Sequence, residues 1–285
     1  MSTGETRATA RRAMTALQRR GEYGIDGSVI GVAGMSAVTA ALLVTAVTLG
    51  RAKFIGAAAI TALVAAVLLT TLGIYLHTTR RGKFLIWAEI LDGLPLRGDE
   101  RILDVGCGRG AVLTLVAERL RHGRVVGIDI WSKADQSGNG IDAAERNLAA
   151  EGVRDRCELV TGDMRSMPFP DASFDVTVSS LAIHNVRNLS GRAQAIEEIA
   201  RTLTPGGRVA IADLAWTRVY ARKLEALGFV GVARRPLGWR FWWGPAFPST
   251  ALVTGTKPGP YRRSQLAISP GDARVSDDLN GEWRS

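Results

Sequence analysis

The stretch RILDVGCGRG, residues 101–110, places an acidic side chain and three closely spaced glycines directly after a short hydrophobic run. A glycine has no side chain, so a ligand can approach the backbone closely at such a turn. Gly106, Gly108 and Ala111 fit the G-x-G-x-x-G/A pattern of dinucleotide-binding turns. A related turn receives S-adenosylmethionine, so these residues alone leave a nicotinamide cofactor and S-adenosylmethionine both open.

Acidic or hydroxyl side chains also follow the next three hydrophobic runs, at Asp129, Asp163 and Ser180. In an open α/β sheet, ligands bind beyond the carboxyl ends of the strands, and these side chains would meet there. Asp129 offers two oxygens to the two hydroxyls of a ribose. Asp163 can accept a hydrogen bond from the amino group of adenine, and the backbone N–H of Met164 can donate one.

His184, in the stretch LAIHNV, is the histidine that we expect nearest to this pocket, because His77 and His122 lie in other predicted elements. A general base assists methyl transfer when the acceptor is a hydroxyl or an acidic carbon. His184 is therefore the candidate catalytic residue, although a lone histidine is more often structural, and both interpretations stay open here.

A metal site is not expected from the cysteine pattern. The two cysteines, Cys107 and Cys157, are far apart in the sequence and belong to no C-x-x-C pair or Cys/His cluster. Two isolated thiols are typical of a reducing compartment.

The elements that must position these residues follow from the alternation of hydrophobic runs and amphipathic segments between about residues 98 and 258. Valine- and isoleucine-rich strands that alternate with helices indicate a mostly parallel sheet with helices on both faces. The predicted strands are 101–105, 124–130, 157–163, 174–180, 208–214 and 249–257, and the predicted helices are 111–123, 141–153, 190–203 and 218–229.

Two uncharged runs, Ser28–Leu49 and Phe54–Leu76, precede this α/β region. Each is long enough to cross the hydrocarbon core of a bilayer as a helix. Only residues 50–53 separate them, so they predict a tight antiparallel transmembrane hairpin. A signal peptide and a pair of helices buried in a soluble core are the alternatives. Residues 78–97 predict a connecting helix that leaves the membrane.

The charge pattern predicts the orientation of the hairpin. The formal net charge is +9, and basic residues are concentrated before the first run and after the second. The positive-inside rule then places both termini and the catalytic domain in the cytoplasm of a two-span protein of the cell membrane. We attribute the basic balance to this membrane-flanking charge, so nucleic-acid binding is not expected. Residues 1–27 are a basic N-terminal segment, and residues 259–285 predict a disordered tail.

Four motifs in order resemble those of class I S-adenosylmethionine-dependent methyltransferases, over about residues 98–258. LDVGCGRGA is similar to the first motif, VVGIDI to the acidic second, TGDMRSMPFPDASFDVTVSS to the third and fourth, and IARTLTPGGRVAIAD to the segment that leads into strand 5. The nearest likeness is to the small-molecule branch that contains ubiquinone and menaquinone C-methyltransferases. The resemblance implies a Rossmann-like seven-stranded α/β sheet in the order 3-2-1-4-5-7-6, with strand 7 antiparallel.

The resemblance also implies roles for individual residues. Gly106 and Gly108 would line the methionine moiety of S-adenosylmethionine, and Ser180 would lie near its sulfonium. Asp129 would bind the ribose, and Ile130 would pack on the adenine. The remaining residues that the resemblance places at the cofactor are Asp163 and Met164 at the adenine edge, together with Asp104 and Gly110 of the first motif.

The expected function is therefore a membrane-anchored methyltransferase acting on a small and, given the hairpin, lipophilic acceptor. An NAD(P)-dependent oxidoreductase and a non-catalytic, cofactor-binding membrane module are the alternatives. The residues do not distinguish C-, O- and N-methylation. The insertion 131–140 and the aromatic segment 234–249 are candidates for covering the cofactor and for lining the acceptor site, although either segment could instead serve only in packing.

Overall fold

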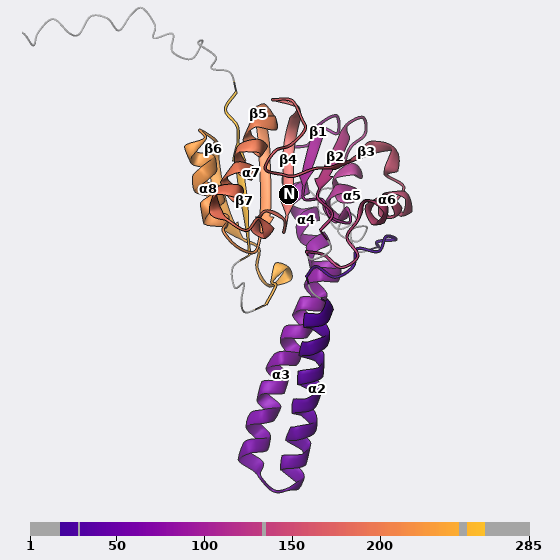
Figure 1. Ribbon diagram of the computed structural model, residues 1–285, viewed down its shortest axis with the longest axis vertical. Coiled ribbons are helices and arrows are strands. Elements are labelled where there is room, and N and C mark those ends of the chain that lie inside the picture. The colour runs from indigo at the N-terminus through magenta and orange to yellow at the C-terminus, as the bar shows by residue number, and fades with distance from the viewer. Residues whose placement is uncertain (1–17, 28, 133–134, 245–249, 260–285) are drawn as a thin grey trace, which may run out of the picture.

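The computed structural model describes residues 18–27, 29–132, 135–244 and 250–259, which form a long helical hairpin joined to an α/β domain (Figure 1). Most of the predicted basic N-terminal segment and nearly all of the predicted disordered tail lie outside these residues. The α-helices are α2 (Val29–Arg51), α3 (Ile55–His77), α4 (Lys83–Asp92), α5 (Ala111–Ala117), α6 (Ile141–Ala150), α7 (Leu189–Thr202) and α8 (Thr217–Ala226). Short helical turns are η1 (Thr78–Gly82), η2 (Arg154–Arg156), η3 (Ile183–Asn185) and η4 (Trp239–Phe241).

Seven strands form one sheet in the order β3-β2-β1-β4-β5-β7-β6, which confirms the expected fold class. The first five strands are parallel, and β7 runs antiparallel to both β5 and β6. The strands are β1 (Arg101–Val105), β2 (Arg124–Asp129), β3 (Cys157–Thr161), β4 (Phe174–Ser180), β5 (Leu203–Asp213), β6 (Val230–Pro236) and β7 (Ala251–Thr256).

Strand β6 is not predicted by the hydrophobic pattern. It lies at the edge of the sheet and its side chains are mostly exposed or half-buried. An edge strand needs little apolar sequence because it has one neighbour and faces solvent. The family resemblance implied seven strands, whereas the residue pattern identified six.

Helices cover both faces of the sheet. Side chains that alternate along a strand point to opposite faces, so Ile102 packs towards α4, α5 and α6, whereas Leu103 packs towards α7 and α8. Both side chains are fully buried. The two hydrophobic clusters therefore hold the carboxyl ends of the parallel strands in fixed positions, and the loops at that edge carry the candidate site.

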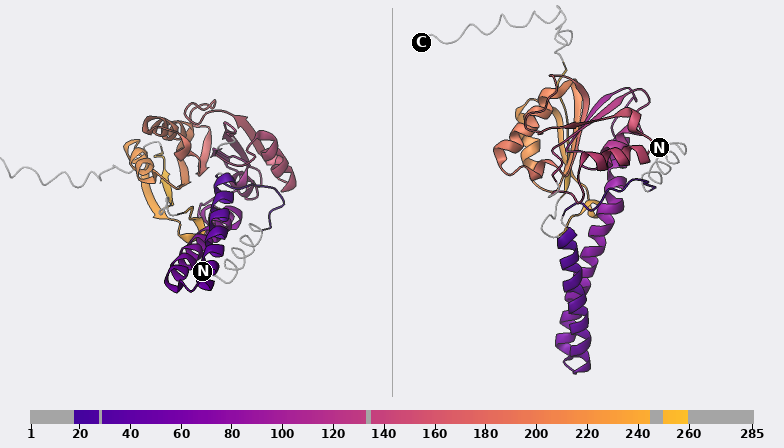
Figure 2. Two further views of the ribbon diagram at one scale, coloured as in Figure 1. Left: turned by 60° about the horizontal axis from the view of Figure 1, so that its bottom comes forward. Right: turned by 45° about the vertical axis from the view of Figure 1, so that its right-hand side comes forward.

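Helices α2 and α3 lie side by side and project from the α/β domain (Figures 1 and 2). They begin and end within two residues of the predicted runs. Both are long and apolar enough to cross a membrane, and few of their side chains are buried within the structure. The hairpin is thus not enclosed in a soluble core.

Helix α3 continues through the π-helical turn η1 into α4 without a break. The predicted connecting helix extended to residue 97, but α4 ends at Asp92. Gly93 and Pro95 follow, and proline has no N–H with which to continue the helix. Trp87 of α4 is fully buried on the sheet. One continuous helix therefore belongs both to the hairpin and to the core of the domain.

Candidate active site

A cavity of about 680 Å³ opens at the carboxyl edge of the parallel strands. This volume is within the usual range for small-molecule and cofactor sites. Its wall combines the loops after β1, β2, β3 and β4 with residues that flank the hairpin. The predicted site residues that line it are Asp104, Gly106, Gly108, Asp129, Ile130, Asp163, Met164, Ser180 and His184.

The turn after β1 needs glycine at two positions. Gly106 and Gly108 both have positive φ angles, of 73° and 51°. A Cβ atom at Gly106 would lie 2.2 Å from the Cβ of Ala182, and one at Gly108 would lie 2.6 Å from the side-chain oxygen of Gln136. Gly110 does not line the cavity; it has a φ of 81° and directly precedes α5. The two glycines thus allow close packing against Ala182 and Gln136, and both also line the cavity.

Asp129 ends β2 and organises the adjoining loops. Its carboxylate accepts hydrogen bonds from the backbone N–H groups of Gly108, at 2.8 Å, and Trp131, at 2.6 Å. Burial raises the pKa of Asp129, while these hydrogen bonds oppose the shift. The side-chain amide of Asn139 lies 3.4 Å from the same carboxylate. Asp129 thus presents a carboxylate to the cavity from a position that two loops hold in place.

Asp104 is a buried carboxyl group whose oxygens make no well-formed hydrogen bond with a described residue, although the backbone N–H of Leu113 lies near enough to oppose the rise of its pKa. Burial, and then the charge of Asp129, raise its pKa to about 8. An unpaired buried carboxyl is costly unless a ligand completes its surroundings. The ammonium group of a methionine moiety is a partner of the right charge.

The residues after β3 also line the end of the cavity where the cofactor is expected. The carboxylate of Asp163 is half-exposed and accepts hydrogen bonds from the guanidinium of Arg165, which lowers the pKa of Asp163. Met164 packs beside the glycine turn. A Cβ atom at Gly106 would lie 3.5 Å from the Cε of Met164. Ile130 lines the cavity with an exposed side chain, which leaves an apolar surface for a flat ring.

Ser180 connects the end of β4 to the helix that leaves the hairpin. Its hydroxyl accepts a hydrogen bond of 2.8 Å from the indole N–H of Trp87. The sequence offered no signal for this contact, because it joins residues 93 positions apart on separate elements. The contact brings α4 directly to the predicted position of the sulfonium.

His184 is paired with Asp213, a residue that sequence reasoning missed. The Nδ1 atom of His184 lies 2.6 Å from a carboxylate oxygen of Asp213, which is fully buried at the end of β5. The backbone N–H groups of His184 and Leu214 and the hydroxyl of Tyr220 also donate to Asp213. When the imidazole is neutral, this carboxylate favours the tautomer with the proton on Nδ1, and Nε2 of His184 is then the nitrogen that can accept a proton. The position of Asp213 at the carboxyl end of a predicted strand was the available signal.

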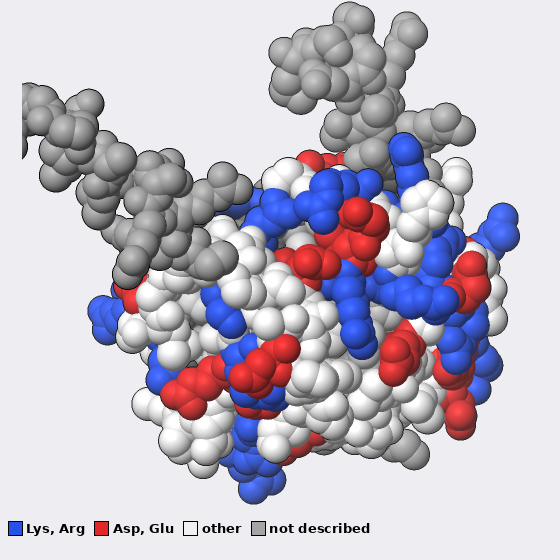
Figure 3. All heavy atoms as spheres, turned by 90° about the horizontal axis from the view of Figure 1, so that it is seen from above, with Lys and Arg blue, Asp and Glu red and all other residues white. Residues whose placement is uncertain are grey.

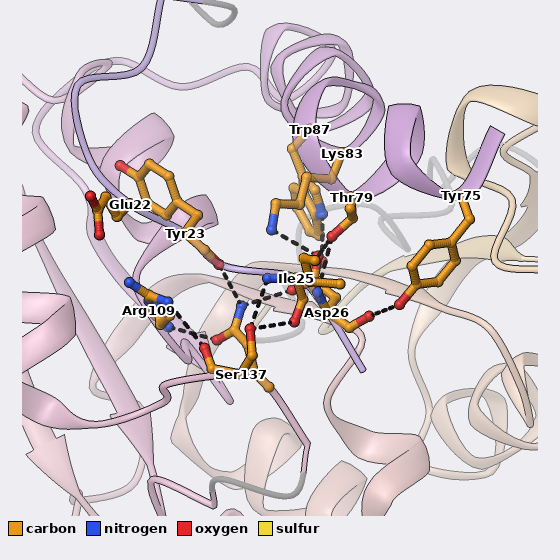
Figure 4. A network of polar contacts seen from close by, with 12 residues as sticks. Glu22, Tyr23, Ile25, Asp26, Tyr75, Thr79, Lys83, Trp87, Arg109 and Ser137 are labelled. Carbon is orange, nitrogen blue, oxygen red and sulfur yellow. Dashed lines mark hydrogen bonds and ion pairs between the residues drawn. The ribbon is translucent and has the colours of Figure 1, made fainter. Parts of the chain in front are cut away.

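Residues 18–27 form a clasp between the hairpin and the cofactor end (Figure 4). The carboxylate of Asp26 accepts hydrogen bonds from the ammonium of Lys83 and the amide of Gln136, both at 2.7 Å. Thr79 also donates to that carboxylate, and the hydroxyl of Tyr75 donates to the Asp26 carbonyl. A single residue before the hairpin thus joins the hairpin helix to the loop over the glycine turn.

The insertion 131–140 contributes directly to the cavity. Gln136 and Asn139 line it, and the side-chain oxygen of Gln136 accepts a hydrogen bond from the N–H of Arg109. The indole of Trp131 instead donates to Thr161, at the end of β3. Trp131 therefore anchors the loop, whereas Gln136 extends over the glycine turn.

The described residues fit S-adenosylmethionine in three respects. Gly106 and Gly108 bring backbone without side chains to the cavity wall, Asp104 is a buried carboxyl that can pair with a cation, and Asp129 offers a carboxylate for a ribose. No group of three or more His, Cys, Asp or Glu side chains suited to a metal occurs within the described residues.

Comparison with known proteins places this site in a family. Residues 103–211 match the family described as a methyltransferase domain. The chain is 37% identical over 120 residues to 27-O-demethylrifamycin SV methyltransferase of Amycolatopsis mediterranei, covering 42% of this chain and 40% of that protein. It is 34% identical over 121 residues to demethylmenaquinone methyltransferase of Symbiobacterium thermophilum, covering 42% and 45%. The matches thus span less than half of each of these relatives.

Solved structures share the fold. The [4+2]-cyclase SpnF superimposes with a TM-score of 0.50 at 21% identity, covering 61% of this chain and 80% of that chain. Geranyl diphosphate C-methyltransferase of Streptomyces coelicolor gives a TM-score of 0.50 at 17% identity, covering 64% and 78%. Because one neighbour is a cyclase, the fold alone does not define the reaction. Residues 103–211 thus form a methyltransferase domain, and the sheet order and cavity residues are those expected from the resemblance to class I S-adenosylmethionine-dependent methyltransferases.

Proposed function

We propose that the protein is anchored in the cell membrane by two spans and transfers the methyl group of S-adenosylmethionine to a lipophilic small molecule. One observation carries this proposal: the cavity is lined at one end by Gly106 and Asp129 and elsewhere by Tyr75, Trp87 and Trp243. The first set suits the cofactor. The second set comes from the hairpin, its continuation α4 and the segment after η4, and it is aromatic.

The cofactor supplies a methyl group that its sulfonium has already activated. The chain then has to hold donor and acceptor in line, and such positioning accounts for much of the rate. Asp129 holds the ribose and Asp104 pairs with the ammonium of the methionine moiety. Ser180, supported by the indole of Trp87, borders the space near the sulfonium.

His184 acts as the general base in this proposal. Asp213 holds the Nδ1 proton, so the free Nε2 can take the proton of an acceptor hydroxyl or acidic carbon as the methyl group is transferred. The buried position of Asp213 keeps the imidazole in one orientation. This arrangement favours an acceptor that must lose a proton.

Relatives support the small-molecule class of the acceptor. The names of two of them refer to a rifamycin and to a menaquinone precursor, and a third is sterol 4-C-methyltransferase of Caenorhabditis elegans, 32% identical over 132 residues, which cover 46% of this chain and 36% of that protein. On the face of the domain turned away from the hairpin, basic and acidic side chains are interspersed (Figure 3). This mixture supports assigning the net charge to the membrane-flanking segments rather than to a nucleic-acid surface.

The test uses the full chain in vesicles with radiolabelled S-adenosylmethionine and two acceptor pools, a membrane lipid extract and a cytosolic extract. We expect label in a product of the lipid extract, lost in the Asp129→Ala variant. Incorporation only into water-soluble compounds would refute the lipophilic acceptor. Calorimetric binding of NAD(H) without binding of S-adenosylmethionine would refute the methyltransferase itself.

A further inference from the structure

The segment Trp239–Trp243, WRFWW, which we call the aromatic segment, lies against the hairpin where the hairpin meets the domain. Trp239 is 62% exposed, although it is one of the largest apolar side chains of the chain. Its ring stacks on His77, the last residue of α3, with centroids 5.4 Å apart and planes 29° apart. An exposed tryptophan thus lies at the domain end of a helix that is apolar enough to cross a membrane.

The structure holds this segment firmly in place. The guanidinium of Arg240 makes two hydrogen bonds, of 2.6 and 3.0 Å, to the carboxylate of Glu89 on α4. A Cβ atom at Gly82 in the turn η1 would lie 2.0 Å from the Arg240 carbonyl oxygen, so the two backbones pack closely. Phe241 is fully buried. The exposure of Trp239 is therefore set by the contacts of its neighbours.

The other end of the segment reaches the cavity. Trp243 is buried, lines the cavity and packs edge-on against Tyr75, with ring centroids 5.8 Å apart. Tyr75 lies two residues before His77, the last residue of α3, and it lines the same cavity. The aromatic segment therefore extends from the exposed surface beside the hairpin to the wall of the active site.

The charges around the segment indicate its partner. Arg80 and Arg81, in the turn η1 that follows α3, are exposed and make no ion pair with a described residue. Tryptophan is enriched at the level of lipid headgroups, where an amphipathic ring is partly hydrated. Exposed arginines beside a span are attracted to anionic headgroups. An exposed tryptophan and two unpaired arginines at one end of an apolar hairpin match a bilayer surface better than a water-facing one.

We propose that the aromatic segment is a membrane-docking surface that lies in the headgroup layer, with Trp239 inserted beside the hairpin. This placement sets the Tyr75–Trp243 wall of the cavity at the bilayer surface. The inference rests on the membrane anchoring that is part of the proposed function. It adds a second contact with the bilayer, made by a loop between the last two strands of the catalytic domain.

The test measures the depth of three single positions in the full chain, reconstituted in vesicles of phosphatidylcholine and phosphatidylglycerol. Trp239→Cys, Leu63→Cys and Arg121→Cys each receive a thiol-reactive fluorophore. Leu63 is exposed near the middle of α3. Arg121 is exposed in the loop before β2, at the amino ends of the parallel strands, whereas the cavity lies at their carboxyl ends. The native Cys107 and Cys157 are buried, so labelling of the unchanged chain measures the background.

Nitroxide lipids that carry the quencher near the headgroup or near the end of the acyl chain then report depth. We expect a blue shift and loss of fluorescence at position 239 with the shallow quencher, a stronger loss at position 63 with the deep quencher, and no loss at position 121. A position 239 that behaves like position 121, while position 63 is quenched, would overturn the docking surface alone. Absence of quenching at position 63 would overturn the membrane anchor of the proposed function.

A second measurement uses the native tryptophans as fluorophores, without an added label. Brominated lipids quench tryptophan fluorescence, and the difference between the unchanged chain and Trp239→Phe isolates the contribution of Trp239. Trp216 is also exposed, directly before α8, and Trp216→Phe is the comparison for loss of an exposed indole elsewhere on the domain. We expect Trp239→Phe to reduce the quenched fraction more than Trp216→Phe does. An equal effect of the two variants would also overturn the proposal.

Discussion

Single residues decide which chemistry the cavity can perform, and the pair His184–Asp213 is central to it. The carboxylate of Asp213 accepts from the imidazole and from three further donors. Asparagine at this position would replace one of its acceptor oxygens with a donor and allow the imidazole to adopt the other tautomer. Asp213 is therefore a positioning residue for His184 in its proposed role as the base.

We expect Asp213→Asn to lower the turnover number by roughly a hundredfold or more, in line with the loss of general-base catalysis, with little change in the affinity for S-adenosylmethionine. Tyr220→Phe removes only a 3.3 Å hydrogen bond to the same carboxylate and is the control. An unchanged turnover number in Asp213→Asn, measured with the identified acceptor, would contradict the role of the pair.

The second prediction for a single residue concerns the protonation of Asp104. Burial and the charge of Asp129 raise its pKa to about 8, whereas an exposed aspartate in the unfolded chain titrates near pH 4. The folded state therefore holds a proton that the unfolded state loses between these values. The stability of the ligand-free chain should fall as the pH rises from about 4 to about 8.

An ammonium group that binds beside Asp104 favours the ionised carboxylate and lowers its pKa. We therefore expect S-adenosylmethionine to displace a proton when it binds at neutral pH. Calorimetry in buffers of different ionisation heat measures this release directly. Asp104→Asn should bind without it, and equal proton release in both proteins would show that another group is responsible.

At the scale of elements, the clasp of residues 18–27 connects three segments of the chain. The hairpin helix, the loop over the glycine turn and the N-terminal segment meet at Asp26 (Figure 4). Its partner Lys83 is almost fully buried, and both side chains line the cavity. A buried charge that loses its partner is strongly destabilising, whereas loss of both partners costs much less.

We expect Asp26→Ala to lower the free energy of unfolding by about 3 kcal/mol because Lys83 is left buried without its carboxylate. The double variant Asp26→Ala/Lys83→Met should recover most of this loss. Denaturant unfolding of the full chain in detergent, followed by near-ultraviolet circular dichroism, measures both. Equal destabilisation in the single and double variants would show that the uncompensated charge of Lys83 is not the cause.

The whole molecule is a catalytic domain whose active-site edge faces its own hairpin (Figure 1). The uncharged spans and their flanking arginines predict that the domain and the hairpin loop lie on opposite sides of the membrane. Lys53 is exposed in the loop between α2 and α3, and Arg121 is exposed on the domain.

In intact cells, a membrane-impermeant thiol reagent should label Lys53→Cys, whereas Arg121→Cys should react only after lysis. The two positions serve as controls for each other, because each is exposed in the folded chain. The reverse labelling pattern would invert the proposed topology, and labelling of both in intact cells would contradict a cytoplasmic domain.

The sequence by itself determined the order of the elements apart from β6, the sheet order through its family motifs, and nine of the residues that line the cavity. These features are readable because strand and helix periods, glycine turns and strand-end carboxylates are local. Asp104, Gly106 and Asp129 all belong to short motifs of this kind. The hydrophobic runs likewise defined the ends of the hairpin helices to within two residues.

Only the tertiary structure decided which distant residues complete the site. Trp87 and Asp26 carry no local signature, because their roles come from contacts with Ser180 and Gln136 on other elements. Asp213 is a strand-end carboxylate, but its pairing with His184 is likewise a contact between separate elements. The same holds for the position of the cavity beside the hairpin, which depends on α3 and α4 forming one continuous helix packed on the sheet. Periodicity records which face of an element is buried, but the partner across that face is chosen by packing.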